Sequence, residues 1–290
     1  KFLGYEVHES SGQVLALLRD SEEVDALSPG EDGFVILDRT PFYAESGGQG
    51  GDRGRMEADG LVFEVTDTRY LAHKVIAHVG TLREGVFHVG DRVHTAVDSV
   101  ARSATATNHS ATHLLHSALR EIVGTHVEQK GSLVEPNRLR FDFSQGEAVD
   151  ATLLDDVERR VNEEIRSNRE VVTRRMNIDE ARTAGAAALF GEKYDDVVRV
   201  VGMGDYSLEL CGGTHVKRTG DIGAFRVVSE SGIAAGVRRI EALTGESARR
   251  RVAEESTALS RVAAVYRTGV GEIESKARQM QIRTRELERK

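Results

Sequence analysis

The first 97 residues carry short runs of apolar residues separated by clusters of turn-forming residues. The runs predict strands over residues 13–18, 33–38, 61–69, 73–79 and 91–97. Turn signals lie between them at 28–30, in the glycine-rich segment 46–54, and at 58–60 and 89–91. Many short strands without a long helical pattern favour a small β-barrel over residues 1–97.

The pattern changes to helical spacing near Asp98. From about residue 99 to 123, apolar residues recur every three or four positions, with Asp98 or Ser99 as the candidate cap and Gly124 as the stop. A second helical pattern covers about 151–166. Strands are expected at about 126–134, 139–143, 171–176, 197–201, 206–210, 224–228 and 237–243. Residues 98–245 therefore predict a two-layer α+β domain.

Residues 246–290 predict a helical segment. Apolar side chains recur every seven residues, at Val252, Leu259, Tyr266, Ile273, Met280 and Leu287. Gly269 and Gly271 interrupt the run, which favours two helices over one rod. The simplest interpretation is a tail that packs on its own domain or on further sequence.

Composition and charge leave several function classes open. Hydrophobic residues make up 39% of 290 residues, enough for a packed core, and no stretch of about 18 apolar residues predicts a membrane span. The net charge is −8, yet residues 246–290 carry 11 basic and 7 acidic side chains, so a nucleic-acid partner is not excluded. The chain starts with neither Met nor a signal pattern, so we expect a piece of a longer polypeptide.

Two pairs of potential metal ligands share the same spacing. His109 and His113 are four residues apart on the first predicted helix, which places them on one face. Cys211, the one cysteine, and His215 are four apart across Gly212-Gly213, after a predicted strand. A lone cysteine excludes an internal disulfide and favours a reducing, cytoplasmic compartment. Three imidazoles and a thiolate suit Zn²⁺.

Neighbouring residues argue against several other kinds of site. His116 lies about 10.5 Å along the helix from His109, so we expect an ordinary helix-face residue. A zinc peptidase needs Glu directly after its first histidine, where this chain has Ser110. The glycine cluster at 47–54 lacks the Gly-Lys-Ser/Thr ending of a phosphate-binding loop, and Arg53 replaces the last glycine of a dinucleotide fingerprint.

Four blocks together resemble alanyl-tRNA synthetases over about residues 1–245. They read NHSATHLLH at 108–116, HVEQKGS at 126–132 and CGGTH at 211–215, with FYAESGGQ at 42–49 upstream. The first three are similar to the editing domain of that family, and the fourth to the glycine-rich motif of the preceding barrel. The resemblance implies hydrolysis of the ester that joins serine or glycine to the 3′ end of tRNA(Ala). It also implies that the remaining synthetase domains are partners. No membrane partner is expected, because no apolar stretch is long enough to span one.

The resemblance also implies roles for single residues. His109, His113, Cys211 and His215 match the zinc positions. If three of them bind, a metal-bound water can act as nucleophile; if all four bind, the zinc positions the substrate, and we favour this second hypothesis. Thr112 and Gln129 match positions close to the substrate. The alternative for each is that its side chain makes only a structural hydrogen bond. The residues expected at the tRNA 3′ end are Gly47, Gly48, Gln49, Asp52 and Arg238.

Other functions stay open at this point. Freestanding alanyl-type editing proteins share the barrel and the editing core, and threonyl-type editing domains share the two ligand pairs. The chain could also be a catalytically silent, zinc-stabilised tRNA-binding module. Gly47-Gly48-Gln49 is also a three-residue match to the Gly-Gly-Gln loop of release factors.

Overall fold

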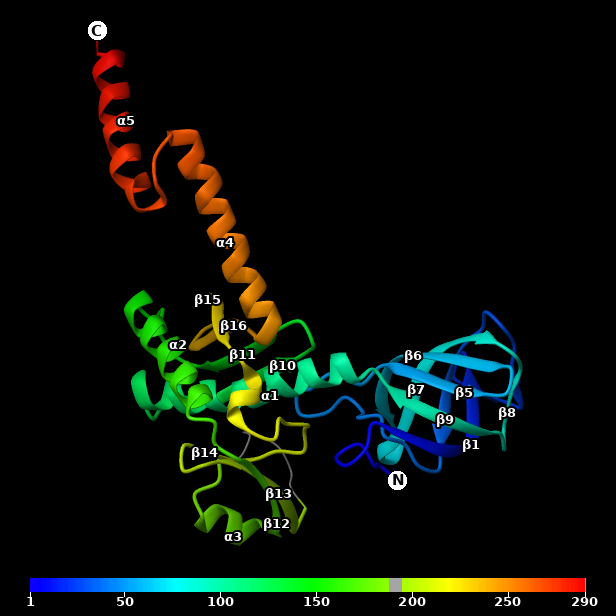
Figure 1. The fold of residues 1–290 in the computed structure, drawn as a ribbon. Coiled ribbons are helices and arrows are strands. Elements are labelled where there is room, and N and C mark those ends of the chain that lie inside the picture. Colours follow the sequence, from blue (N-terminus) through cyan, green and yellow to red (C-terminus); the bar gives the residue numbers. More distant parts are fainter. Residues whose placement is uncertain (188–194, 290) are drawn as a thin grey trace. The chain divides into compact units, whose positions relative to one another are not determined.

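The computed structural model describes residues 1–187 and 195–289 (Figure 1). They form two compact units, Lys1–Gly245 and Glu246–Lys290. The described part of the first unit holds two large hydrophobic cores, one in the barrel and one in the α+β half, and a smaller third cluster around Ala181. The boundary predicted between residues 97 and 98 falls between these two cores, inside one compact unit.

Within the described residues, six strands close the predicted β-barrel in the order β1-β4-β7-β6-β5-β9, and β9 pairs back onto β1. Their inward side chains, such as Leu17, Val35 and Phe63, are fully buried. The six strands are β1 (Glu9–Arg19), β4 (Asp32–Leu37), β5 (Gly54–Ala58), β6 (Leu61–Leu71), β7 (Val75–Glu84) and β9 (Arg92–Val97). Short elements complete the rim: β2 (Glu22–Val24), β3 (Ala26–Leu27), β8 (Phe87–His88) and the 3-10 turn η1 (Ala72–Lys74).

The second half has the predicted two layers. Helices α1 (Ser99–Ile122) and α2 (Ala151–Arg166) pack on a sheet in the order β10-β11-β16-β15. Its strands are β10 (Gln129–Val134), β11 (Leu139–Ser144), β16 (Val237–Thr244) and β15 (Phe225–Ala234). Asp98 caps α1 as predicted, because its carboxylate accepts hydrogen bonds from the backbone N–H groups of Val100 and Ala101.

A small third sheet supports one of the ligand pairs. It runs in the order β12-β13-β14, formed by β12 (Val171–Asn177), β13 (Val197–Met203) and β14 (Ser207–Leu210). A short helix α3 (Ile178–Thr183) packs Ala181 against Val198, Val200 and Leu210. The sequence pattern missed α3, because six residues are too short for a helical periodicity. A capping box of Asn177 and Glu180 marks its start.

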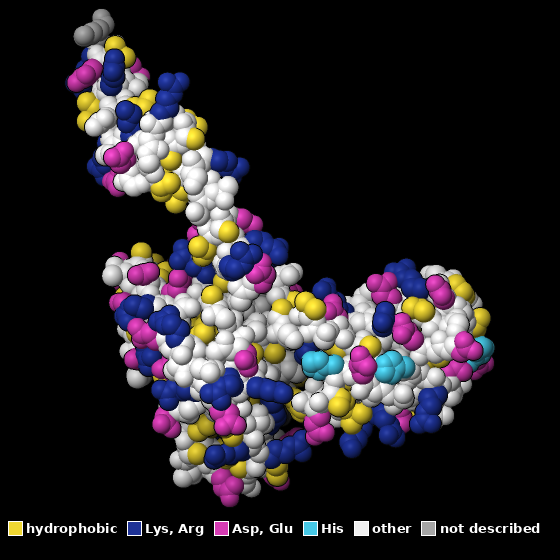
Figure 2. All heavy atoms as spheres, in the orientation of Figure 1, with side chains coloured by type: hydrophobic (Ala, Val, Ile, Leu, Met, Phe, Trp, Pro, Cys, Tyr) yellow, Lys and Arg dark blue, Asp and Glu magenta, His cyan; other side chains and the backbone are white. Residues whose placement is uncertain are grey.

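The second unit is helical with the predicted break. It contains α4 (Gly245–Tyr266), the 3-10 turn η3 (Val270–Glu272) and α5 (Ile273–Glu288). Val252, Leu259, Met280 and Leu287 of the seven-residue repeat are each about half exposed or more. None of the described helices is both long enough and apolar enough to cross a membrane. Figure 2 shows Lys and Arg mixed with Asp and Glu over the visible face, so neither sign of charge forms one large patch there.

Candidate metal centre and its cavity

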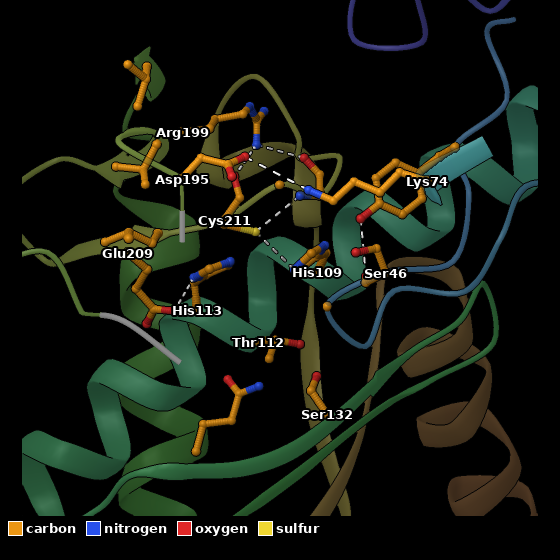
Figure 3. Close-up of a pocket in the computed structure, with 18 residues that line it drawn as sticks. Ser46, Lys74, His109, Thr112, His113, Ser132, Asp195, Arg199, Glu209 and Cys211 are labelled. Carbon is orange, nitrogen blue, oxygen red and sulfur yellow. Dashed lines mark hydrogen bonds and ion pairs between the residues drawn. The ribbon is translucent and has the colours of Figure 1, made fainter. Parts of the chain in front are cut away.

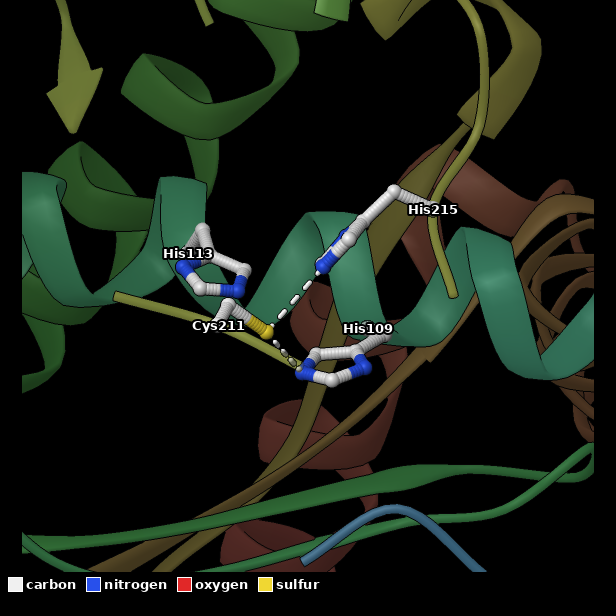
Figure 4. Close-up of side chains that lie close together, drawn as sticks. All are labelled: His109, His113, Cys211 and His215. Atoms are coloured by element: carbon white, nitrogen blue, oxygen red, sulfur yellow. Dashed lines mark hydrogen bonds between the residues drawn. The ribbon is translucent and has the colours of Figure 1, made fainter. Parts of the chain in front are cut away.

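The two ligand pairs come together in space (Figure 4). Helix α1 stacks the rings of His109 and His113 with their centroids 5.3 Å apart, and the loop after β14 brings Cys211 and His215 against them. One ligand atom from each residue lies within 4.8 Å of all the others. These four residues, hereafter the His/Cys cluster, can hold a metal ion, as their spacing predicts.

Each histidine of the His/Cys cluster has a partner at its Nδ1 atom. His109 contacts Oε1 of Gln49 at 2.8 Å, and His215 contacts Oγ of Ser110 at 3.1 Å. Nδ1 of His113 lies 2.6 Å from a carboxylate oxygen of Glu209, an ion-pair contact whose angles are outside those of a hydrogen bond. Partners of this kind fix the tautomer and the ring orientation of metal-binding histidines.

The inward-facing atoms fit a metal ion. Nε2 of His109 and of His215 lie 3.4 and 3.2 Å from Sγ of Cys211. Nε2 of His113 is buried and has no hydrogen-bond partner among the residues that the structure describes. A buried polar atom without a partner destabilises the fold unless a ligand binds to it. Burial raises the pKa of the Cys211 thiol, but the surrounding histidines outweigh burial and hold that pKa well below its usual range. A thiolate with three imidazoles is a borderline-soft donor set, which suits zinc.

Glu209 connects the His/Cys cluster to a further buried histidine, His116. Its second carboxylate oxygen lies 2.9 Å from Nδ1 of His116, and both side chains are buried. His113 and His116 hold the pKa of the Glu209 carboxyl at about 2 despite its burial. His116 is thus outside the metal cluster, as expected, but it is a buried partner of Glu209 rather than an ordinary helix-face residue.

Sequence reasoning missed Glu209, although a signal for it exists. In a strand, residues two apart point to the same face, so Glu209 and Cys211 are expected on one side of the strand that leads into the ligand loop. A carboxylate two residues before a metal-binding cysteine is therefore placed to contact a neighbouring histidine.

A cavity of about 310 Å³ lies beside the His/Cys cluster (Figure 3). Three of the four cluster residues line it, all except His215. Of the other predicted site residues, Thr112, Gln129 and Gly47 also line it. Lys74 of the barrel turn η1 and Arg199 of β13 reach its rim, so both halves of the first unit build one cavity.

The glycine-rich loop joins the barrel to the second half. The backbone of Gly48 and Gly50 exchanges hydrogen bonds with Val134 at the end of β10. Gly48 has φ +84°, and a Cβ there would lie 2.7 Å from the carbonyl oxygen of Ser132. No side chain fits at position 48, so close packing is by itself a sufficient reason for glycine there.

Gln49 is fully buried and is not part of the cavity lining. Its Nε2 donates to Oγ1 of Thr214, and its Oε1 accepts from the backbone N–H of Thr214. The structure therefore places Gln49 behind His109 instead of at an exposed loop tip, where the glutamine of a release-factor-like loop would act.

Asp52 lies away from the cavity, in a buried ion pair with Arg102. Arg102 also donates to the carbonyl oxygens of Gly4 and Pro41, at 2.8 and 2.9 Å. Both carboxylate oxygens of Asp52 accept from the guanidinium, and one also accepts from the backbone N–H of Tyr43. These contacts give Asp52 a structural role, which differs from the expected contact with the tRNA 3′ end.

Arg238 also lies outside the cavity lining. Its guanidinium makes two hydrogen bonds to the Glu230 carboxylate on the neighbouring strand, at 2.5 and 2.6 Å. The adjacent Arg239 is paired in the same way with Asp142. The alternation of a strand sets the two arginines on opposite faces, and each one meets a carboxylate that the local sequence pattern did not reveal.

Comparison with known proteins shows which families the chain is similar to. Residues 1–101 match the family described as tRNA synthetases class II (A). Residues 198–241 match the threonyl and alanyl tRNA synthetase second additional domain. The chain is 55% identical to the alanine–tRNA ligase of Halorhodospira halophila, 54% to that of Methylococcus capsulatus and 52% to that of Acidithiobacillus ferridurans, in each case over its whole length. This chain is related along its whole length to alanyl-tRNA synthetases.

The resemblance read from the sequence motifs is thereby confirmed. The chain spans 33% of the length of each of these three relatives.

Proposed function

We propose that this chain is the editing segment of an alanine–tRNA ligase, and that it hydrolyses the ester of Ser-tRNA(Ala) or Gly-tRNA(Ala). One observation carries the proposal: the cavity brings together the His/Cys cluster, the hydroxyl of Thr112 and the glycine-rich loop of the barrel. We further propose tRNA(Ala) and the other synthetase domains as its partners, and the cytoplasm as its location.

A hydrolytic site is needed because a synthetic site alone discriminates too weakly between similar amino acids. A synthetic site that admits alanine can reject an analogue with one extra hydroxyl, or one carbon fewer, by only about 1–3 kcal/mol. This difference leaves too many errors for protein synthesis. A second site that hydrolyses the wrong product supplies the missing discrimination.

Thr112 is our candidate for recognising serine. Its hydroxyl donates a hydrogen bond to the carbonyl oxygen of Asn108 at 2.8 Å, one turn earlier on α1. The hydrogen of Oγ1 is therefore directed into the helix, and the oxygen lone pairs are left to accept a hydrogen bond. A serine hydroxyl in the cavity can donate to them, while alanine offers no such donor. Gln129, which also lines the cavity, can bind the remaining polar groups.

All four residues of the His/Cys cluster would hold the zinc ion. A bound zinc supplies positive charge beside the ester and orients polar groups of the substrate. The four side chains provide enough ligands for a closed tetrahedral site, which favours a positioning role over activation of a bound water. The Nδ1 partners Gln49, Glu209 and Ser110 keep the three imidazoles in place for this task.

The glycine-rich loop provides room for the nucleotide end. At Gly47 a Cβ atom would have no heavy atom within 4 Å, so this part of the loop is open. Gly47 also has φ +59°, a conformation that glycine adopts without steric cost. Lys74 lines the cavity with a side chain that is 84% exposed and lies 3.9 Å from the similarly exposed Asp195, and it can turn its cation to a backbone phosphate.

Deacylation assays test the proposal. The chain is incubated with tRNA(Ala) charged with serine, glycine or alanine, and release of the free amino acid is followed. We expect faster hydrolysis of the seryl and glycyl esters than of the alanyl ester. A folded, metal-loaded chain that binds tRNA but accelerates none of the three hydrolyses would support the silent tRNA-binding module instead.

A further inference from the structure

Besides Gln49, which accepts from the backbone N–H of Thr214, two further side chains from outside hold the backbone of the ligand loop, residues 211–215. Nη1 of Arg199 donates to the carbonyl oxygens of Cys211 and Gly213, at 2.7 and 2.8 Å. The hydroxyl of Tyr5 donates to the carbonyl oxygen between them, that of Gly212. Three consecutive carbonyl groups are thus bonded to two side chains.

The two side chains also contact each other. The guanidinium carbon of Arg199 lies 4.4 Å from the centroid of the Tyr5 ring, a cation–π contact. Arg199 belongs to β13 of the second half, whereas Tyr5 belongs to the segment that precedes the first barrel strand. The pair therefore connects the barrel side of the first unit to the ligand loop.

Tyr5 is itself held in place. The neighbouring carbonyl oxygen of Gly4 accepts a hydrogen bond from Arg102, whose charge is paired with Asp52. The ring of Phe2 packs edge-on against the Tyr5 ring, with centroids 4.9 Å apart. The N-terminal segment thus presents the Tyr5 hydroxyl from a fixed position.

The ligand loop needs such support, because its own residues give it little rigidity. Gly212 and Gly213 have many accessible backbone conformations, and freezing them costs conformational entropy. Gly213 cannot be replaced by a stiffer residue, since a Cβ there would lie 2.0 Å from the His109 ring. Contacts from outside the loop are the remaining way to restrict it.

We propose that Tyr5 and Arg199 are positioning residues that hold Cys211 and His215 in the metal-binding arrangement. The N-terminal segment then contributes to metal retention although it supplies no ligand. This inference rests on the metal site of the proposed function but not on the hydrolysis. Outer contacts of metal sites typically change metal affinity about 10-fold to 100-fold.

Metal release tests the proposal without any activity assay. The chain is loaded with Zn²⁺, an excess of a chromogenic chelator is added, and the rate of zinc transfer is measured for wild type, Arg199→Met and Tyr5→Phe. The matched controls are Arg175→Met, because Arg175 lies directly opposite Arg199 on β12, and Tyr70→Phe, because Tyr70 is a half-exposed tyrosine of β6. Thermal unfolding of each variant is recorded with and without zinc.

We expect Arg199→Met to release zinc at least about tenfold faster than wild type, Tyr5→Phe to release it several-fold faster, and both controls to match wild type. The added stability from zinc should shrink in the first two variants only. Unchanged release in Arg199→Met and Tyr5→Phe would overturn the proposal, as would equal acceleration in the controls. If deacylation is absent but zinc release is accelerated, the proposed function fails and this inference stands.

Discussion

Oε1 of Gln49 accepts a hydrogen bond from Nδ1 of His109 at 2.8 Å, across 60 positions of the chain. The amide orientation is fixed by two further bonds, because the backbone N–H of Thr214 donates to the same oxygen and Nε2 donates to the Thr214 hydroxyl. His109 must therefore carry its proton on Nδ1. Its Nε2 lone pair is left for a metal, and the glycine-rich loop of the barrel takes part in forming the His/Cys cluster.

Replacing Gln49 by Met tests this relationship. Methionine has a similar length but cannot accept the proton of His109, so we expect metal affinity to fall by about 10-fold to 100-fold. Competition with a chelator of known affinity measures the change. Gln13→Met, on an exposed part of β1, is the control, and an affinity of Gln49→Met equal to that control would contradict the assigned role.

Thr112→Val tests serine recognition. Valine keeps the volume of threonine and removes the hydroxyl, so a bound serine loses its acceptor at a cost of about 1–3 kcal/mol. We expect the ratio of Ser-tRNA(Ala) to Ala-tRNA(Ala) hydrolysis to fall by about tenfold or more, whereas Thr112→Ser keeps most of it. Both rates are compared in variants with unchanged thermal stability. An unchanged ratio in Thr112→Val would show that the hydroxyl only bonds to Asn108.

Local patterns in the sequence predict most of the fold. The helix at 151–166 matches α2 residue for residue, because a clear apolar stripe sets its length and Asp150 caps its first turn. The strand expected from residue 73 starts at Val75 instead, since residues 72–74 form a 3-10 turn and Lys74 has φ +60°. Such backbone exceptions have no signal in hydrophobic periodicity.

The cluster residues could be predicted, but not their surroundings. Ligand spacing is local, so the pairs at 109/113 and 211/215 are visible in the sequence. The contacts of Gln49 and Arg199 depend on how distant segments pack, and no pattern within one segment encodes them. For Glu209 the alternation of a strand gives only the side on which it lies, and not the histidines that it meets. The role of Asp52 illustrates this limit, because its partner Arg102 lies 50 residues away.

Asp52→Asn separates the structural role of this residue from an expected tRNA contact. Removing the charge leaves the buried Arg102 without its counter-ion, which costs about 3–5 kcal/mol. Urea unfolding should show this loss, whereas Asp59→Asn in an exposed turn should leave stability unchanged. A loss below about 1 kcal/mol, together with weaker tRNA binding, would restore the 3′-end role.

His78 predicts a pH dependence of barrel stability. It is fully buried, its Nδ1 contacts the Val35 carbonyl oxygen at 2.7 Å, and its Nε2 contacts the Thr40 hydroxyl at 2.7 Å. A carbonyl can only accept, so Nδ1 carries the proton and Nε2 accepts from Thr40. Burial lowers the pKa of His78 to about 4.

Because the folded pKa of His78 lies below its unfolded value, the unfolded chain binds the proton first as the pH falls. Stability is therefore complete above about pH 6.5 and declines toward pH 4, by about 3 kcal/mol from this residue. Urea unfolding at pH 7 and pH 4 measures how much stability wild type and His78→Gln each lose over this range. The titration of the His/Cys cluster contributes equally to both losses, so it cancels when one loss is subtracted from the other. Equal losses in both proteins would contradict this account.

We propose that the cavity beside the His/Cys cluster hydrolyses mischarged tRNA. Single-turnover release of serine from Ser-tRNA(Ala) tests it most directly, with the wild-type chain beside the double variant His109→Ala/Cys211→Ala. We expect about one zinc per wild-type chain and serine release well above the spontaneous rate, and a double variant with no bound zinc and the spontaneous rate. Equal rates for the two folded proteins, or a wild-type rate no faster than buffer alone, would contradict the account.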